Sequence, residues 1–337
     1  MSDDQSFLHH QAALGFGPYG PEDELLHPAA KNDIQHDALT ETQYFGFSVP
    51  EARIHGFSYL WHHPNLGTLS SGVAAWQGIK PHHLAAELYD FRMFMSEQTI
   101  AAGIDHYKTD VGYQVDVIEP FKLIRIRYED ASRGNALDIS YTALTPPAML
   151  PNRKHFEQTM KTKGFLSLRG KRYEVDGYNV RDRSWGEARR EEPTPFPPIA
   201  WLTGVFGEDF SFNCTLTDHP RRSPEWLGLY QVPDEQVLKG GWIYRNGEHK
   251  RVVEGIKLTR RDPLSLCPLS HELELVDQDG ERLRITGTVE SSSPSGFWPN
   301  VSIHIGLVRW QCENRVGWGD SQECQWTDFV HRMNSRR

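Results

Sequence analysis

The sequence predicts an all-β protein whose strands fall into two roughly equal halves. From residue 53 onward, short stretches of β-branched and aromatic residues mixed with polar ones are separated by turn-forming residues. Helical periodicity is weak and is clearest near PHHLAAELYDF and in the tail WTDFVHRM. At 337 residues, the chain exceeds the usual size of one domain. We therefore expect two β domains, each built as a barrel or a sandwich.

Two proline-rich segments interrupt the strand pattern and divide the chain. Residues 1–50 are rich in Gly, Pro, Asp and His, which predicts an irregular leader with a short helical turn around Pro21 to Leu26. TPPAMLPN at 145–152 and TPFPP at 194–198 break the pattern, and the second is the favoured boundary. The expected parts are a leader over 1–50, an N-terminal β domain over 51–193 and a C-terminal β domain over 194–337.

Three hairpins are indicated by alternation and by turn chemistry. In FKLIRIRY, residues 121–128, side chains alternate between two faces, and the turn EDASRGN leads into the returning stretch LDISYTAL. The Asn-Gly pair in RNGE and the Asp-Gly pair in DQDGE favour the tight turns that join hairpin strands.

Composition excludes several classes of partner. The formal net charge is -9 and no long Lys/Arg run is present, so neither nucleic acid nor an anionic membrane has electrostatic support as a partner. We expect no stable membrane insertion and a cytoplasmic protein, because the acidic N-terminus lacks an apolar core and no stretch approaches the roughly 18 apolar residues that span a bilayer. The four cysteines form no CxxC pair, which favours buried thiols in a reducing compartment.

The most informative segment is residues 155–186, HFEQTMKTKGFLSLRGKRYEVDGYNVRDRSWG. Strand alternation places Tyr178, Val180, Asp182 and Ser184 on one face, with Asn179, Arg181, Arg183 and Trp185 on the other. An apolar cavity weakens a carboxylic acid and a guanidinium strengthens it, so the surroundings of Asp182 decide whether it can serve as a proton donor.

The combination of HFEQ, YEVDGYNVRDRSWG and GGWIYRNGE resembles the AttH-like and carotenoid 1,2-hydratase (hydroxyneurosporene synthase) superfamily of two-domain lipocalin-like proteins, over roughly residues 50–330. The resemblance implies a pair of antiparallel β-barrels after the irregular leader. The hydratase branch of that superfamily adds water across an isolated alkene by acid catalysis, and related cyclases fold a polyene for cycloaddition. Residues 181–186 match a WxDxxWG-like turn, which implies that Asp182 is the proton donor. Arg181 stands where an aromatic residue often precedes that aspartate.

Protonating an alkene requires a strong acid in a dry site and aromatic faces that stabilise the resulting cation. We therefore predict a cofactor-independent enzyme that acts on an apolar terpenoid or polyketide-like molecule by hydration, dehydration, isomerisation or cyclisation. The predicted catalytic residues are Asp182, His155, Glu157 and His304, and the predicted substrate-binding residues are Arg181, Arg183, Trp185, Tyr178, Tyr244 and Trp310. His155 and Glu157 share a strand face, and His304 shares its face with Ser302, so each is a candidate for a proton network.

Other interpretations of the same residues stay open. Glu157 would be a structural residue, and not a catalytic one, if it neutralised Arg181 or Arg183. His304 would be a core histidine, and the aromatic residues would simply fill a barrel core. For the whole protein, the alternatives are a carrier that binds a hydrophobic ligand unchanged, and an inter-domain latch in which Asp182 forms a salt bridge with an arginine.

No metal or cofactor is expected. The pairs His9-His10, His62-His63 and His82-His83 are neighbours in sequence, and on a strand such neighbours point to opposite faces. HExxH, a Gly-rich phosphate loop and GxSxG do not occur in the sequence. The expected partner is a hydrophobic small-molecule substrate, and the sequence leaves a homodimer open.

Overall fold

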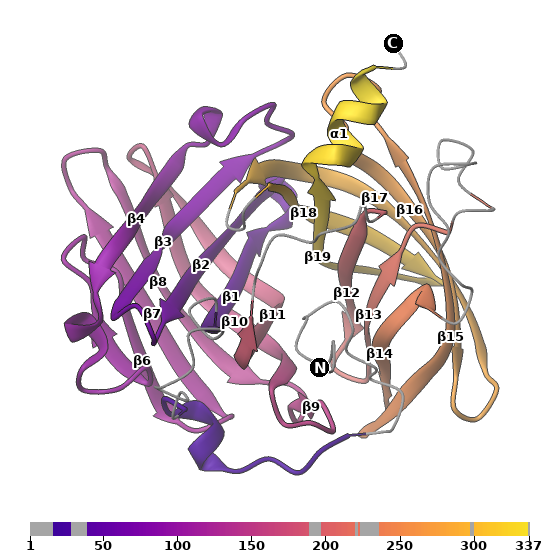
Figure 1. The fold of residues 1–337 in the computed structure, drawn as a ribbon, viewed down its shortest axis with the longest axis horizontal. Helices are drawn as coiled ribbons and strands as arrows, with labels where there is room; N and C mark the ends of the chain where they lie inside the picture. The colour runs from indigo at the N-terminus through magenta and orange to yellow at the C-terminus, as the bar shows by residue number, and fades with distance from the viewer. Residues whose placement is uncertain are drawn as a thin grey trace. The chain divides into compact units, whose positions relative to one another are not determined.

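The computed structural model describes residues 16–27, 39–188, 197–219, 222, 236–296 and 300–335. The chain forms two compact units. The first contains residues 16–77 and 86–188 of the described chain, and the second contains residues 78–85 and the described residues from 197 onward. Each unit is built on one antiparallel β-sheet, which confirms the all-β prediction (Figure 1).

The first unit is an open sheet of eleven strands in the order β4-β3-β2-β1-β11-β10-β8-β7-β6-β5, with β9 paired to β10. Its strands are β1 (Leu39–Val49), β2 (Ile54–His63), β3 (Thr68–Gln77), β4 (Leu88–Ser96), β5 (His106–Lys108), β6 (Gln114–Glu119), β7 (Leu123–Asp130), β8 (Asn135–Ala143), β9 (Ala148–Met149), β10 (His155–Leu168) and β11 (Lys171–Ala188). Short 3-10 turns occur at η3 (Pro21–Glu24), η5 (Pro50–Ala52) and η7 (Glu97–Ile100).

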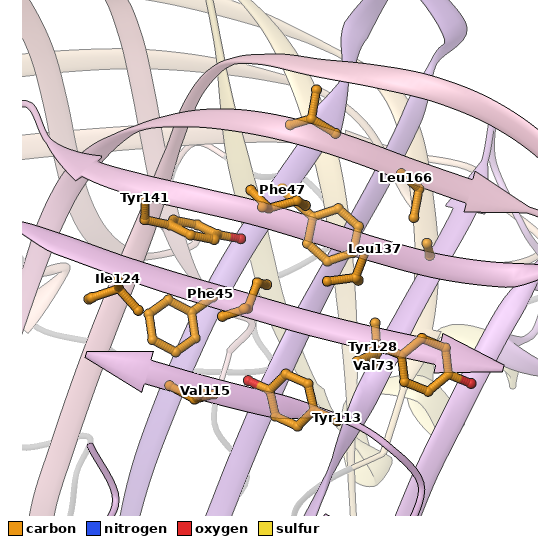
Figure 2. Close-up of a cluster of buried hydrophobic side chains, with 14 of the residues drawn as sticks. Phe45, Phe47, Val73, Tyr113, Val115, Ile124, Tyr128, Leu137, Tyr141 and Leu166 are labelled. Carbon is orange, nitrogen blue, oxygen red and sulfur yellow. The ribbon is translucent and has the colours of Figure 1, made fainter. Parts of the chain in front are cut away.

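This sheet curls until strands from its two ends meet across an apolar interior. Figure 2 shows Phe45 and Phe47 of β1 among side chains of β6, β7, β8 and β10. The ring of Phe45 lies 5.3 Å from that of Tyr141 on β8. The Tyr128 hydroxyl on β7 donates to Asp90 of β4 at 2.7 Å. Buried aromatic rings therefore join the two halves of the sheet, and the hydroxyl group of Tyr128 has a hydrogen-bond partner there.

The second unit is a closed barrel of eight strands in chain order. They are β12 (Ile199–Gly207), β13 (Phe210–Thr217), β14 (Leu238–Arg245), β15 (Glu248–Arg261), β16 (Pro268–Asp277), β17 (Arg282–Ser295), β18 (Val301–Cys312) and β19 (Arg315–Trp326). The short turn η6 (His83–Ala85) belongs to this unit, and α1 (Thr327–Asn334) follows β19. Trp310 lies at the centre of the apolar core, where its indole nitrogen donates to the Thr203 carbonyl at 2.7 Å.

The predicted hairpins are confirmed. β7 and β8 pair as the alternation indicated, and the RNGE and DQDGE turns join β14 to β15 and β16 to β17. In the first of these turns, Asn246 and Gly247 adopt φ values of 49° and 94°, a conformation that Asn-Gly accommodates easily. The helical tail is also confirmed as α1, and the helical turn near Pro21 as η3.

Two expectations need correction. The leader was expected to run to residue 50, but β1 occupies Leu39–Val49 and is buried along its whole length. Its polar beginning, TETQ, conceals the strand because both of its faces are covered and the usual alternation is lost. PHHLAAELYDF is also not a helix: only His83–Ala85 form a 3-10 turn, and the segment continues into β4, which pairs with β3.

Other expectations concern boundaries and thiols. The boundary expected at residue 193 falls on residues outside those that the structure describes. All four cysteines are free and buried, as predicted. Across the described residues, the helices are too short to traverse a bilayer.

Candidate active site

The two faces of β11 carry different chemistry, as the alternation predicted. Arg181 lies opposite Phe45 and Arg183 lies opposite Gln43, both on the face that packs into the interior of the first sheet. Asp182 points to the other face, because neighbouring strand residues alternate. The candidate acid and the two arginines are therefore on opposite sides of one strand.

A row of four side chains crosses adjacent strands on the Asp182 face. Glu157 of β10 lies directly opposite Asp182, and Asp182 in turn lies opposite Tyr44 of β1. Tyr44 lies opposite Tyr59 of β2. Directly opposed residues have Cβ atoms about 5 Å apart. Two carboxyl groups thus stand side by side at the end of an aromatic row.

His155 extends the acidic end of this row. Its Nε2 lies 3.4 Å from Glu157 Oε1. One step along the strands, Ser184 of β11 exchanges a hydrogen bond of 2.7 Å with Thr42 of β1. A proton can therefore pass between a carboxyl group and an imidazole within this cluster.

Glu157 Oε2 and the indole nitrogen of Trp61 lie on this face, and each is buried without a hydrogen-bond partner among the described residues. Glu157 is 6% exposed and Trp61 5% exposed. Buried polar atoms in native proteins are normally paired with protein, water or ligand, so each of these atoms can accept or donate one further hydrogen bond.

Aromatic rings form the rest of the face. The Tyr44 ring lies 5.8 Å from that of Phe57 and 6.3 Å from that of Tyr59. Phe57 in turn packs edge-on against Trp76 at 5.9 Å. This surface presents π-faces next to the carboxyl pair, which is the combination that a carbocation requires.

The arginines have other carboxylate partners. Arg181 binds Glu24 of η3 through Nη1 at 3.0 Å and Nη2 at 2.5 Å, and Arg183 binds Glu41 of β1. The interpretation in which Glu157 neutralises Arg181 or Arg183 is therefore wrong. The interpretation in which Asp182 forms a salt bridge with an arginine stays open for arginines other than these two. Burial alone would raise the pKa of Glu24, but the Arg181 and Arg183 charges and the Phe121 amide lower it below its usual value.

Trp185 and Tyr178 lie on β11, on either side of Asp182 in sequence. Trp185 belongs to a small apolar cluster with Phe156, and its ring stacks on His27 at 3.9 Å. Tyr178 is half-buried, and the ammonium of Lys161 lies 5.9 Å from its ring centroid. Trp185 shares the arginine face, whereas Tyr178 shares the face of Asp182.

The remaining predicted residues belong to the second unit. Trp310 is fully buried in the barrel core. Tyr244 alternates with the core residue Ile243 and so faces outward, where its ring lies 5.0 Å from that of His249. His304 points into the barrel, directly opposite Glu323 of β19.

Glu323 is part of a network of four buried charges inside the barrel. The Lys257 ammonium pairs with Asp218 and lies 3.5 Å from Glu323, and Arg261 binds both Asp218 and Glu323 at 2.7 Å. Burial raises the pKa of Asp218 and of Glu323, but the Arg261 and Lys257 charges lower each below its usual value. The charges balance within the network, which limits the cost of burying them.

Two histidines adjoin this network in their neutral form. Burial lowers the pKa of His271 to about 3 and that of His304 to about 4. His271 Nδ1 lies 3.0 Å from the Thr259 hydroxyl, and its Nε2 lies 3.0 Å from the Ser321 hydroxyl. His304 Nδ1 is buried and has no hydrogen-bond partner among the described residues.

Sequence reasoning missed the aromatic half of the first site and most of the buried network. Tyr44 and Thr42 lie in β1, which the polar beginning of that strand concealed. Asp218, Lys257 and Glu323 are far apart in sequence and meet only because the barrel closes. An available signal was the run Lys257, Thr259, Arg261, in which polar residues repeat at the strand period on one face.

Solved structures share this fold. CghA aligns with a TM-score of 0.59 and 12% identity, over 96% of this chain and 98% of that one. Kievitone hydratase from Nectria haematococca aligns with a TM-score of 0.52 and 10% identity, over 95% and 98%. An AttH-type protein from Nitrosomonas europaea aligns with a TM-score of 0.60 and 13% identity, over 94% of this chain and 98% of that one. The resemblance to AttH-like lipocalin-type proteins is thereby confirmed for the fold.

The amino-acid sequence was also compared with curated proteins and with families. No curated protein matches. Residues 20–328 match the family described as "Domain of unknown function (DUF7064)". This match spans most of both units, and the chain therefore belongs to the DUF7064 family and has the two-barrel fold of the AttH-like proteins.

Proposed function

We propose that this protein is an enzyme of the hydratase or cyclase kind, acting on an apolar small molecule without a cofactor. The observation that carries the proposal is the row Glu157, Asp182, Tyr44, Tyr59, in which a carboxyl pair adjoins aromatic faces. The similar structures add support, since one is named a hydratase and another, CghA, was solved with the compound Sch210972.

In the proposed reaction, the protonated carboxyl group of Asp182 donates its proton to a carbon of an alkene. The cation that forms is stabilised by the π-faces of Tyr44 and Tyr59. Water then adds to the cation and releases a proton to Glu157, from which His155 can accept it. A proton returns to Asp182 before the next turnover. In a cyclisation, a second alkene of the substrate replaces the water as the nucleophile, and the new cation then loses a proton from an adjacent carbon to Glu157.

The proposed substrate is a terpenoid or polyketide-like molecule that is apolar over most of its length. Phe57, Tyr59 and Trp61 supply the apolar surface, and the buried indole nitrogen of Trp61 offers a donor for one oxygen of the substrate. The predicted roles of His304, Tyr244 and Trp310 in this reaction stay predictions, as does the cytoplasmic location.

The test is mass spectrometry of small molecules extracted from purified wild type and from Asp182→Asn, each after incubation with cell extract. Asp176→Asn is the matched control, because Asp176 lies on the same face of β11 and is exposed. An apolar compound retained by Asp182→Asn, but converted by wild type and by Asp176→Asn, supports the enzyme. The same compound unchanged in all three would identify a carrier and refute the proposal.

A further inference from the structure

We infer that the interior of the first unit contains a carboxylate-binding site, centred on Arg181, that Glu24 of the chain's own segment 16–27 occupies in this structure. The ligand that would compete for this site is an amphiphilic carboxylate with an aromatic or alkyl group. The inference does not rest on the proposed function, because Arg181 lies on the opposite face of β11 from Asp182.

The charges within the sheet leave Arg181 without an anionic partner of its own. Arg183 pairs with Glu41, which belongs to the neighbouring strand β1. Within the sheet, Arg181 donates from Nε to the neutral amide oxygen of Gln158 at 2.9 Å. Among the described residues, its carboxylate partner is Glu24, which comes from the 3-10 turn outside the sheet.

A buried guanidinium without an anion is costly. The Arg181 side chain is 0% exposed and that of Glu24 is 1% exposed. If Glu24 leaves, the sheet retains a desolvated cation whose planar fork matches a carboxylate in two parallel hydrogen bonds. The site therefore favours another carboxylate over water or a neutral group.

Aromatic rings beside Arg181 define the rest of the ligand. The guanidinium carbon of Arg181 lies 5.0 Å from the ring centroid of Phe156 and 5.6 Å from that of Phe121. Tyr19 of segment 16–27 packs edge-on against Phe121 at 5.1 Å. The segment thus presents a carboxylate and an aromatic ring together, which are the two features expected of the ligand.

Polar contacts provide much of the attachment of segment 16–27. Arg153 binds Asp23 at 3.1 Å and Glu22 at 3.2 Å, and Arg183 donates to the carbonyl groups of Asp23 and Leu25. Phe16, Tyr19 and Leu25 are 41%, 46% and 47% exposed, so these apolar side chains are only partly covered. A ligand that binds Arg181 more tightly than Glu24 does can therefore shift the segment to a released state.

The test uses 3-phenylpropanoate as the probe and 3-phenylpropan-1-ol as its uncharged match. Glu24→Ala removes the built-in carboxylate beside Arg181. We expect calorimetry to show that this variant binds 3-phenylpropanoate at least tenfold more tightly than wild type. The affinity for the alcohol should stay the same, and Glu24→Ala/Arg181→Gln should lose the gain.

Each opposite result overturns the inference. Equal affinity of wild type and Glu24→Ala for the acid would exclude competition by Glu24. An equal gain for the alcohol, or a gain that survives in Glu24→Ala/Arg181→Gln, would exclude a site centred on the Arg181 charge.

A second variant covers the case in which Glu24→Ala does not fold. Arg153 is 42% exposed and contacts segment 16–27 from outside. Arg153→Ala should weaken the attachment and raise the affinity for 3-phenylpropanoate above that of wild type. In wild type, the probe should also speed hydrogen exchange at the amide of Gly17, which donates to the Met149 carbonyl. Unchanged affinity in Arg153→Ala and unchanged exchange in wild type would together refute the inference.

Discussion

Asp182 on β11 lies directly opposite Glu157 on β10, on the same face of the first sheet. Like charges directly opposed on neighbouring strands are destabilising, so two carboxyl groups in this position need neighbouring groups that offset the repulsion. His155 lies close enough to Glu157 to take part. This arrangement leads to the first prediction, which follows from the proposed role of Asp182 as the acid.

Asp182→Asn should reduce turnover of the extracted compound by about 10² to 10⁴-fold, the range expected when a general acid is lost. Glu157→Gln should reduce it by a smaller factor, because His155 remains. Steady-state kinetics on both variants, beside Asp176→Asn, measures the effect. Full activity of Asp182→Asn would remove it from the catalytic residues.

Arg181→Met should lower the free energy of unfolding by about 3–5 kcal/mol, because it leaves the buried carboxylate of Glu24 without its partner. The double variant Arg181→Met/Glu24→Leu should recover most of this loss, since it removes both charges. Urea denaturation of wild type, the two single variants and the double variant gives the coupling energy. Equal losses in Arg181→Met and in the double variant would show that the ion pair does not matter for stability.

Lowering the pH from about 6.5 to 4.5 should destabilise the protein, in part through His271. Its pKa is about 3 in the folded protein and near 6.5 when unfolded, so the unfolded chain takes up a proton in this window and the folded one does not. The contribution is up to about 1.4 kcal/mol per pH unit. His271→Gln should reduce the pH dependence of the free energy of unfolding by this amount and so flatten the pH dependence of the melting temperature. His331→Gln, on the exposed side of α1, is the control. An unchanged slope in His271→Gln would contradict the assignment.

Gly287→Ala should destabilise the second barrel by about 1–3 kcal/mol, the usual cost of overpacking a core. A Cβ atom at this position would lie 2.4 Å from Trp310 Cζ3, and the hydrogen bond from the indole to Thr203 resists a shift of that ring. Tryptophan fluorescence during denaturation should report the change. Gly177→Ala is the control, because a Cβ there would meet open space.

Alternation was sufficient to predict the β7–β8 hairpin and the two faces of β11. Asp182 and Arg181 were placed correctly on opposite faces, because side chains in a strand alternate regardless of what surrounds them. The partners of the arginines could not be predicted in the same way. Glu24 and Glu41 lie in the first fifty residues, which lack the periodicity that marks a strand or helix.

The register of distant strands was the other missing information. Tyr44 lies opposite Asp182 only because β1 pairs with β11, and in the sequence these two strands are separated by most of the first unit. Likewise Lys257 meets Glu323 only in a closed barrel. Such contacts depend on long-range pairing that no local pattern encodes.

The open and closed sheets also differ in the backbone that they offer to another chain. Every strand of the second unit has neighbours on both sides, whereas β4 and β5 end the sheet of the first unit. On β4, Met93 and Phe94 are 49% and 81% exposed, and Phe94 adopts a φ of 58°, which bends the strand away from regular pairing. Among the strands that the structure describes, only the first unit therefore offers free sheet edges for strand addition, and this kink on β4 works against it.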